Sequence, residues 1–120
     1  MAKITRFEDL QSWQKARVLA NVIYDLTAYQ GFSKDFPLRD QIRGAAGSVM
    51  HNIAEGFDAG SDAEFVRFLK YARRSATEVQ SQLYLAMDRK YVREGEREKA
   101  HDLATEAKKL INGMIGYLRN

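Results

Sequence analysis

The sequence has 120 residues, of which 45% are hydrophobic and 29% are charged, proportions that fit one soluble globular domain. The absence of cysteine excludes a disulfide framework, a thiolate metal site and a cysteine nucleophile. No apolar run approaches the roughly 20 residues that span a bilayer, and the first residues lack a signal-peptide core, so we expect a cytoplasmic protein without a membrane partner. The net charge of +3 allows nucleic-acid binding but does not require it.

The first predicted helix covers about residues 8–29. Apolar residues recur there at steps of three and four, which is the spacing of one buried helix face. They are Leu10, Trp13, Ala16, Ala20, Ile23 and Leu26. Gly31 follows, and we expect it to end this helix in a left-handed conformation.

The second predicted helix covers about residues 37–57. Pro37 suits its first position, because the N–H that proline lacks has no partner there. The middle of the segment, Gly44 to Ser48, consists of small residues only. Two glycines inside a helix are unfavourable, and we expect the close approach of a neighbouring helix to compensate for them.

Two further helices are predicted at about residues 62–89 and 96–118. Ser61 and Glu64 have the spacing of a capping box at the start of the first of these. All the links are short, and short links place successive helices side by side in opposite directions. The sequence therefore predicts an all-α, antiparallel up-down-up-down four-helix bundle that forms a single domain over residues 1–120.

Few residues in the chain suit catalysis or metal binding. His51 and Glu55 lie one turn apart, with Glu78 on the next helix, but a di-iron bundle needs more carboxylate and histidine ligands than these. Ser48 lies three residues before His51 without an acid to orient the histidine. We therefore predict a protein that is not an enzyme and holds no metal or other cofactor.

Short polar side chains form one row on the second predicted helix and another on the third. Short hydrogen-bonding groups in place of long solvated ones indicate a semi-buried helix–helix or subunit interface, although an ordinary exposed face remains an alternative. The residues assigned to this polar network or interface are Gln41, Arg43, Ser48, Asn52, Glu55, Ser75 and Glu78. We expect charge-assisted hydrogen bonds to join Arg43, Asn52, Glu55, Arg73 and Glu78.

A basic stripe follows the third predicted helix. Arg67, Lys70 and Arg74 have a spacing of three and four, Arg73 lies beside them, and no acidic residue occurs between Phe65 and Glu78. Such a stripe could follow the phosphates of a nucleic acid. The alternative is a solvated face whose charges are paired with acidic neighbours.

Several segments along the chain together match the pattern of a known family. They are Phe7-Glu8-Asp9-Leu10, Trp13-Gln14-Lys15-Ala16, Gln41-Ile42-Arg43, Asn52-Ile53-Ala54-Glu55-Gly56 and Phe68-Leu69, together with Ser48, Ala72, Arg73, Ser75 and Glu78. Through these residues the chain resembles the bacterial four-helix bundle proteins encoded in 23S rRNA intervening sequences. That family is similar to the accessory variability determinant proteins of diversity-generating retroelements.

The resemblance implies an antiparallel bundle that assembles into a homo-oligomeric ring of five subunits. It also implies a basic surface that meets RNA or DNA, or a nucleic-acid enzyme such as a reverse transcriptase, and no established enzymatic activity. The favoured hypothesis is a non-enzymatic adaptor that uses the basic faces of a ring. The alternative is a protein–protein scaffold with no affinity for nucleic acid, in which an exposed apolar patch binds the partner.

Overall fold

The computed structural model describes residues 3–120, and these residues contain helices and no strand. Met1 and Ala2, the first two residues of the predicted domain, lie outside the described residues. A 3-10 helix, η1, comes first and five α-helices follow. Their bounds are η1 Phe7–Asp9, α1 Gln11–Thr27, α2 Gln30–Lys34, α3 Phe36–Phe57, α4 Asp62–Asp88 and α5 Glu94–Arg119.

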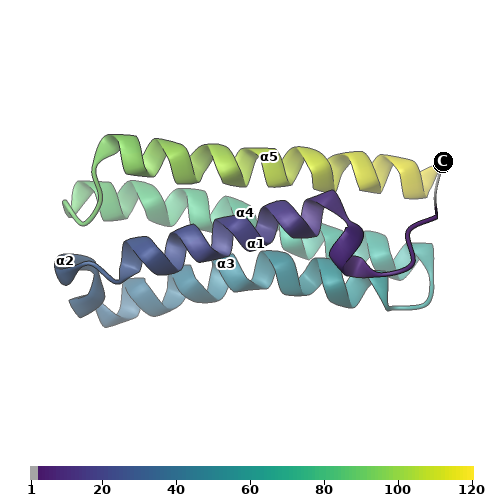
Figure 1. The fold of residues 1–120 in the computed structure, drawn as a ribbon, viewed down its shortest axis with the longest axis horizontal. Helices are drawn as coiled ribbons and strands as arrows, with labels where there is room; N and C mark the ends of the chain where they lie inside the picture. Colours follow the sequence, from purple (N-terminus) through teal and green to yellow (C-terminus); the bar gives the residue numbers. More distant parts are fainter. Residues whose placement is uncertain (1–2) are drawn as a thin grey trace.

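Four long helices lie side by side along a body of 45 × 23 × 19 Å (Figure 1). Helix α1 packs against α3 and α5, and α4 packs against the same two helices from the other side. The short helix α2 packs mainly against α3 near one end of the body. The described chain is therefore an all-α helical bundle.

The first predicted helix is divided in the structure. Leu10 has an extended backbone between η1 and α1, and a second break at Ala28 and Tyr29 separates α1 from α2. The expectation that Gly31 ends the first helix is wrong, because Gly31 lies inside α2 and has no positive φ. Helix α2 carries Phe32, which is only 1% exposed and stacks on Tyr91. Burial of this aromatic ring explains why the chain turns here and forms another short helix.

The other helix ends lie within two residues of their predicted positions. Helix α3 begins at Phe36, where the Asp35 side chain accepts a hydrogen bond from the backbone N–H of Leu38. Helix α4 begins after Ser61, whose hydroxyl accepts from the N–H of Glu64 at 3.2 Å. The Glu64 carboxylate binds Arg67, so only this half of the predicted capping box is observed.

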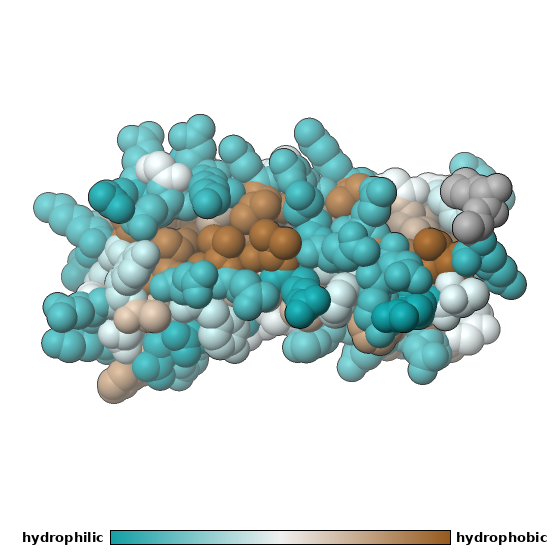
Figure 2. Space-filling view, viewed as in Figure 1, coloured by the Kyte–Doolittle hydropathy of each residue, from teal (hydrophilic) through white to brown (hydrophobic). Residues whose placement is uncertain are grey.

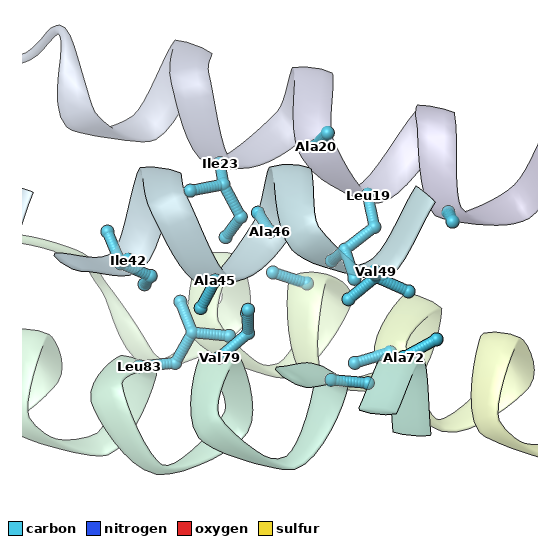
Figure 3. Packing of buried hydrophobic residues seen from close by; sticks show 14 of the residues in the cluster. Leu19, Ala20, Ile23, Ile42, Ala45, Ala46, Val49, Ala72, Val79 and Leu83 are labelled. Atoms are coloured by element: carbon cyan, nitrogen blue, oxygen red, sulfur yellow. The ribbon is translucent and has the colours of Figure 1, made fainter. Parts of the chain in front are cut away.

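The core runs the length of the bundle and is built mostly from aliphatic side chains (Figure 3). Leu19 and Ile23 of α1 meet Ile42 and Val49 of α3, and none of the four is exposed to solvent. Alanines lie between these larger residues, and Ala46 and Ala72 are also fully buried. Small side chains at these positions allow the helix backbones to come close together.

The glycines of α3 do not all serve close packing. A Cβ atom added at Gly56 would lie 2.7 Å from the Cβ of Phe68 and 2.9 Å from the Cδ1 of Phe65, so α4 approaches α3 here without room for a side chain. By contrast, beyond the adjoining backbone of α3 itself, no described atom lies within 4 Å of a Cβ added at Gly44, and Gly47 has only the His51 side chain nearby. The expectation that Gly44 and Gly47 admit a neighbouring helix is therefore wrong.

We predict that Gly56→Ala destabilises the bundle. Overpacking a helix contact costs about 1–3 kcal/mol, and the higher helix propensity of alanine returns only about 1 kcal/mol. The same change at Gly44, on the same helix but in open space, should raise the free energy of unfolding by about 0.5–1 kcal/mol. Urea unfolding of both variants measures the contrast, and equal stabilisation by both would contradict the close approach of the two helices.

Candidate nucleic-acid interface

The four predicted nucleic-acid residues lie within two turns of α4 and are not equivalent. Arg67 and Arg74 are exposed, whereas Lys70 and Arg73 are half-buried. Helix geometry places Lys70 and Arg74 about 6 Å apart along the axis, on the same side as Arg67. We call Arg67, Lys70, Arg73 and Arg74 the α4 cationic stripe.

Arg67 is held by two neighbours on its own helix. Its Nε and one terminal nitrogen donate to the two carboxylate oxygens of Glu64 at 3.2 and 2.7 Å. Its other terminal nitrogen donates to the Tyr71 hydroxyl at 3.0 Å. Hydrogen bonding to the Arg67 guanidinium lowers the pKa of Glu64, and the Glu64 carboxylate raises the pKa of Arg67 in turn. Both groups are therefore charged at neutral pH, and they largely cancel each other.

Two aromatic rings support the arginines of the stripe. The Cζ of Arg67 lies 5.1 Å from the ring centre of Phe68 and 5.6 Å from that of Tyr71. The Cζ of Arg74 lies 5.2 Å from the same tyrosine ring. Sequence reasoning missed Tyr71 and assigned Phe68 to the apolar stripe, although the spacing of Tyr71 from Arg67 and Arg74, by four and three, could have indicated the stacking.

The remaining cations of the stripe are not neutralised by acidic neighbours. Within residues 3–120, Lys70, Arg73 and Arg74 form no ion pair with a carboxylate. Arg73 donates to the side-chain oxygen of Asn112 on α5 at 2.7 Å, which fixes its position without cancelling its charge. The alternative of a face with paired charges thus describes Arg67 but not the other three residues.

Part of the predicted polar row forms a hydrogen-bonded cluster between α3 and α4. The Ser75 hydroxyl donates to the Ser48 hydroxyl oxygen at 2.9 Å. The Asn52 amide donates to the hydroxyl and carbonyl oxygens of Ser48, each at 2.8 Å. All three residues are half-buried, so this cluster is a helix–helix contact.

The other residues of the two rows lie apart from this cluster. Arg43 turns to α1, where its Nε donates to the Thr27 hydroxyl at 2.7 Å and its guanidinium lies over the ring of Tyr24. Glu78 accepts from Gln82 on its own helix, and Gln41 and Glu55 are exposed. The five-residue network expected around Arg43 and Arg73 is therefore not formed.

The structure also places the residues considered for metal binding. His51 and Glu55 are exposed on α3, as is Glu78 on α4. In the described part of the chain, no three histidine, aspartate or glutamate side chains come together as a metal site would require. Nor does any helix among residues 3–120 have both the length and the apolar character to cross a membrane.

A second surface lies along α1 and α5. Figure 2 shows an elongated apolar strip among polar side chains on this face of the molecule. An open groove of about 690 Å³ follows α1, and its apolar lining includes Trp13, Val18 and Val22. Val18 and Leu110 of α5 also line an adjoining hollow, and Val18 itself is 48% exposed.

A sequence profile described as 23S rRNA-intervening sequence protein matches residues 8–113, which is most of the chain. The chain belongs to this family. The fold is also similar to the crystal structure of a protein with unknown function from the S23 ribosomal protein family of Bacteroides thetaiotaomicron VPI-5482. The two sequences are 27% identical, the TM-score is 0.78, and the match covers 87% of this chain and 97% of the other. No curated protein matches the chain.

The Ser48–Ser75 bond predicts a modest loss of stability in Ser75→Ala. A neutral, half-buried hydrogen bond contributes about 1 kcal/mol, well below the cost of breaking a buried ion pair. Ser81→Ala, at an exposed position of the same helix, is the control and should be neutral or slightly stabilising. Thermal and urea unfolding measure both, and equal effects would argue against the bond.

Proposed function

We propose that this family member is a non-enzymatic adaptor that binds nucleic acid through the α4 cationic stripe. The observation that carries the proposal is the grouping of Lys70, Arg73 and Arg74 on one helix, in a segment without acidic residues from 66 to 77. None of the three forms an ion pair with a carboxylate within residues 3–120. Cations without acidic partners remain available for phosphates. RNA and DNA both present such phosphates, so the stripe supports either as a partner.

The proposal includes assembly of an antiparallel up-down-up-down bundle into a homo-oligomeric ring, with five subunits as the expected number. One stripe contains few cations, and the net charge of the chain is only +3. Repeating the stripe around a ring would let one polymer engage several copies, which raises the overall affinity through effective concentration. The resemblance to accessory variability determinant proteins supports a nucleic-acid enzyme, such as a reverse transcriptase, as a further partner.

The stripe predicts salt-dependent binding to duplex and single-stranded probes. Replacing Lys70 and Arg74 by alanine should weaken binding. The slope of log affinity against log salt concentration, measured on duplex DNA, should also become shallower by about 0.9 for each phosphate that the variant no longer neutralises. Lys99→Ala together with Lys109→Ala removes the same charge from exposed positions of α5 and serves as the control. Fluorescence anisotropy across salt concentrations measures both variants. Equal weakening by the two pairs would mean that net charge alone drives binding.

A second candidate function is a protein scaffold without nucleic-acid affinity. The exposed apolar strip along α1 and α5 favours this alternative, because exposed contiguous apolar surface often marks a protein-binding site. Val18 is the most exposed aliphatic residue of α1. If the protein is a scaffold, Val18→Glu should therefore abolish binding of its protein partner. Under the adaptor proposal, the same variant retains its affinity for nucleic acid.

The ring proposal predicts a solution mass five times the 13.7 kDa of one chain. We propose that the exposed polar rows around Glu55 and Glu78 form the contact between subunits. Reversing both charges, with Glu55→Arg and Glu78→Arg, should therefore reduce the mass measured by light scattering, while Val18→Glu should not. A monomeric wild-type protein would contradict the ring, and dissociation by Val18→Glu alone would place the contact on the α1 groove.

A further inference from the structure

We propose that Arg67, supported by Phe68 and Tyr71, is a stacking platform for an unpaired base, so that α4 prefers single-stranded nucleic acid to duplex. This inference rests on the proposed function, because it names the class of nucleic acid that the α4 cationic stripe takes. It gives Arg67 a role different from that of Lys70 and Arg74. Arg67 differs from Lys70 and Arg74 in its hydrogen bonds within the protein and in its contacts with aromatic rings.

All three nitrogens of the Arg67 guanidinium are hydrogen-bonded within the protein. Three of its five N–H donors bind the two oxygens of Glu64 and the hydroxyl of Tyr71. The Glu64 carboxylate also cancels its charge and would repel an approaching phosphate. Arg67 is therefore a poor phosphate ligand, although it lies in a basic stripe.

The Arg67 side chain is packed on aromatic rings and yet remains accessible. Its guanidinium lies over the ring of Phe68, and Tyr71 contacts it as well. The Arg67 side chain nevertheless keeps 50% of its surface exposed. A guanidinium group that is hydrogen-bonded at its edges, contacts two aromatic rings and keeps half of its side chain exposed is one on which a base can stack, as unpaired bases do on arginine and aromatic side chains.

The flanking cations are suitably placed for the phosphates of such a strand. Lys70 follows Arg67 by one turn of the helix and Arg74 by two, at rises of about 4.5 and 10.5 Å. Neither forms an ion pair with a carboxylate in the described residues, and Arg74 is kept in place by the ring of Tyr71. A single strand can turn one base onto Arg67 while its backbone meets these cations. A duplex keeps its bases stacked inside and can use only the cations.

The test compares two single strands of equal length and charge, and adds a duplex. The single strands are a fluorescein-labelled 12-nucleotide oligouridine and an abasic strand with the same number of phosphates, and the third probe is a duplex RNA. The wild-type protein should bind oligouridine about tenfold more tightly than the abasic strand, since stacking is worth that much or more per base. Arg67→Lys keeps the positive charge but lacks a planar guanidinium, so the preference for oligouridine should disappear. Binding of this variant to the abasic strand should change less than about twofold.

Two further variants separate stacking from charge. Arg89→Lys makes the same exchange at an exposed arginine just after α4 and should leave the preference unchanged. Glu64→Gln removes the charge that holds Arg67, so binding to the abasic strand should strengthen while the preference for oligouridine falls. Circular dichroism confirms that each variant folds before it is compared.

The outcomes distinguish this inference from the proposed function. Equal wild-type affinity for oligouridine and the abasic strand, with binding that weakens in Lys70→Ala and Arg74→Ala, would overturn the stacking platform and leave the adaptor in place. A preference for oligouridine that survives Arg67→Lys would also overturn the platform. Absence of binding to every probe at low salt would overturn both proposals.

Discussion

The close contact between α3 and α4 at Gly56 determines which side of α4 faces solvent. Phe65 and Phe68 approach the Gly56 backbone so closely that no side chain fits there. Further along the same pair of helices, the Ser48 and Ser75 hydroxyls are joined by a hydrogen bond. With this side of α4 fixed on α3 and another packed on α5, the remaining surface carries the cations. The position of the α4 cationic stripe thus follows from helix packing.

Local electrostatics then divides the stripe into two kinds of residue. Glu64 lies one turn before Arg67, forms a two-point contact with it and largely cancels its charge. Lys70, Arg73 and Arg74 lie beyond the reach of Glu64, and within the described residues no other carboxylate pairs with them. A short run of sequence therefore produces one neutralised, rigid guanidinium and three cations available for phosphates. These two kinds of residue suit different parts of a nucleotide.

The apolar periodicity of the sequence was sufficient to predict the long helices, because it reports which face of each helix is buried. Helices α3 and α4 begin and end within one residue of the predicted bounds. The break that creates α2 could not be predicted in this way, since it depends on burying Phe32 against Tyr91, which lies far away in the chain.

The candidate site was predicted in part for a similar reason. Spacing along a helix grouped the cations of α4 and placed Ser48 and Ser75 in the polar rows, but it did not pair these two serines. It could not show which neighbouring helix a long side chain reaches, and so Arg43 was assigned to the wrong contacts: it binds Thr27 of α1. The same limit applies to Gly44, whose small size was interpreted as a packing contact although the position is open.

Photochemical crosslinking tests the central claim, binding through α4, most directly. A single-stranded RNA containing 4-thiouridine is irradiated with the wild-type protein, and the crosslinked peptides are mapped by mass spectrometry. The account predicts crosslinks in the segment around Arg67, Phe68 and Tyr71, and none at Val18 or Leu110, which line the hollow between α1 and α5 and stand for a groove on that face. Crosslinks confined to that groove, or spread evenly over the lysines and arginines of all helices, would contradict it.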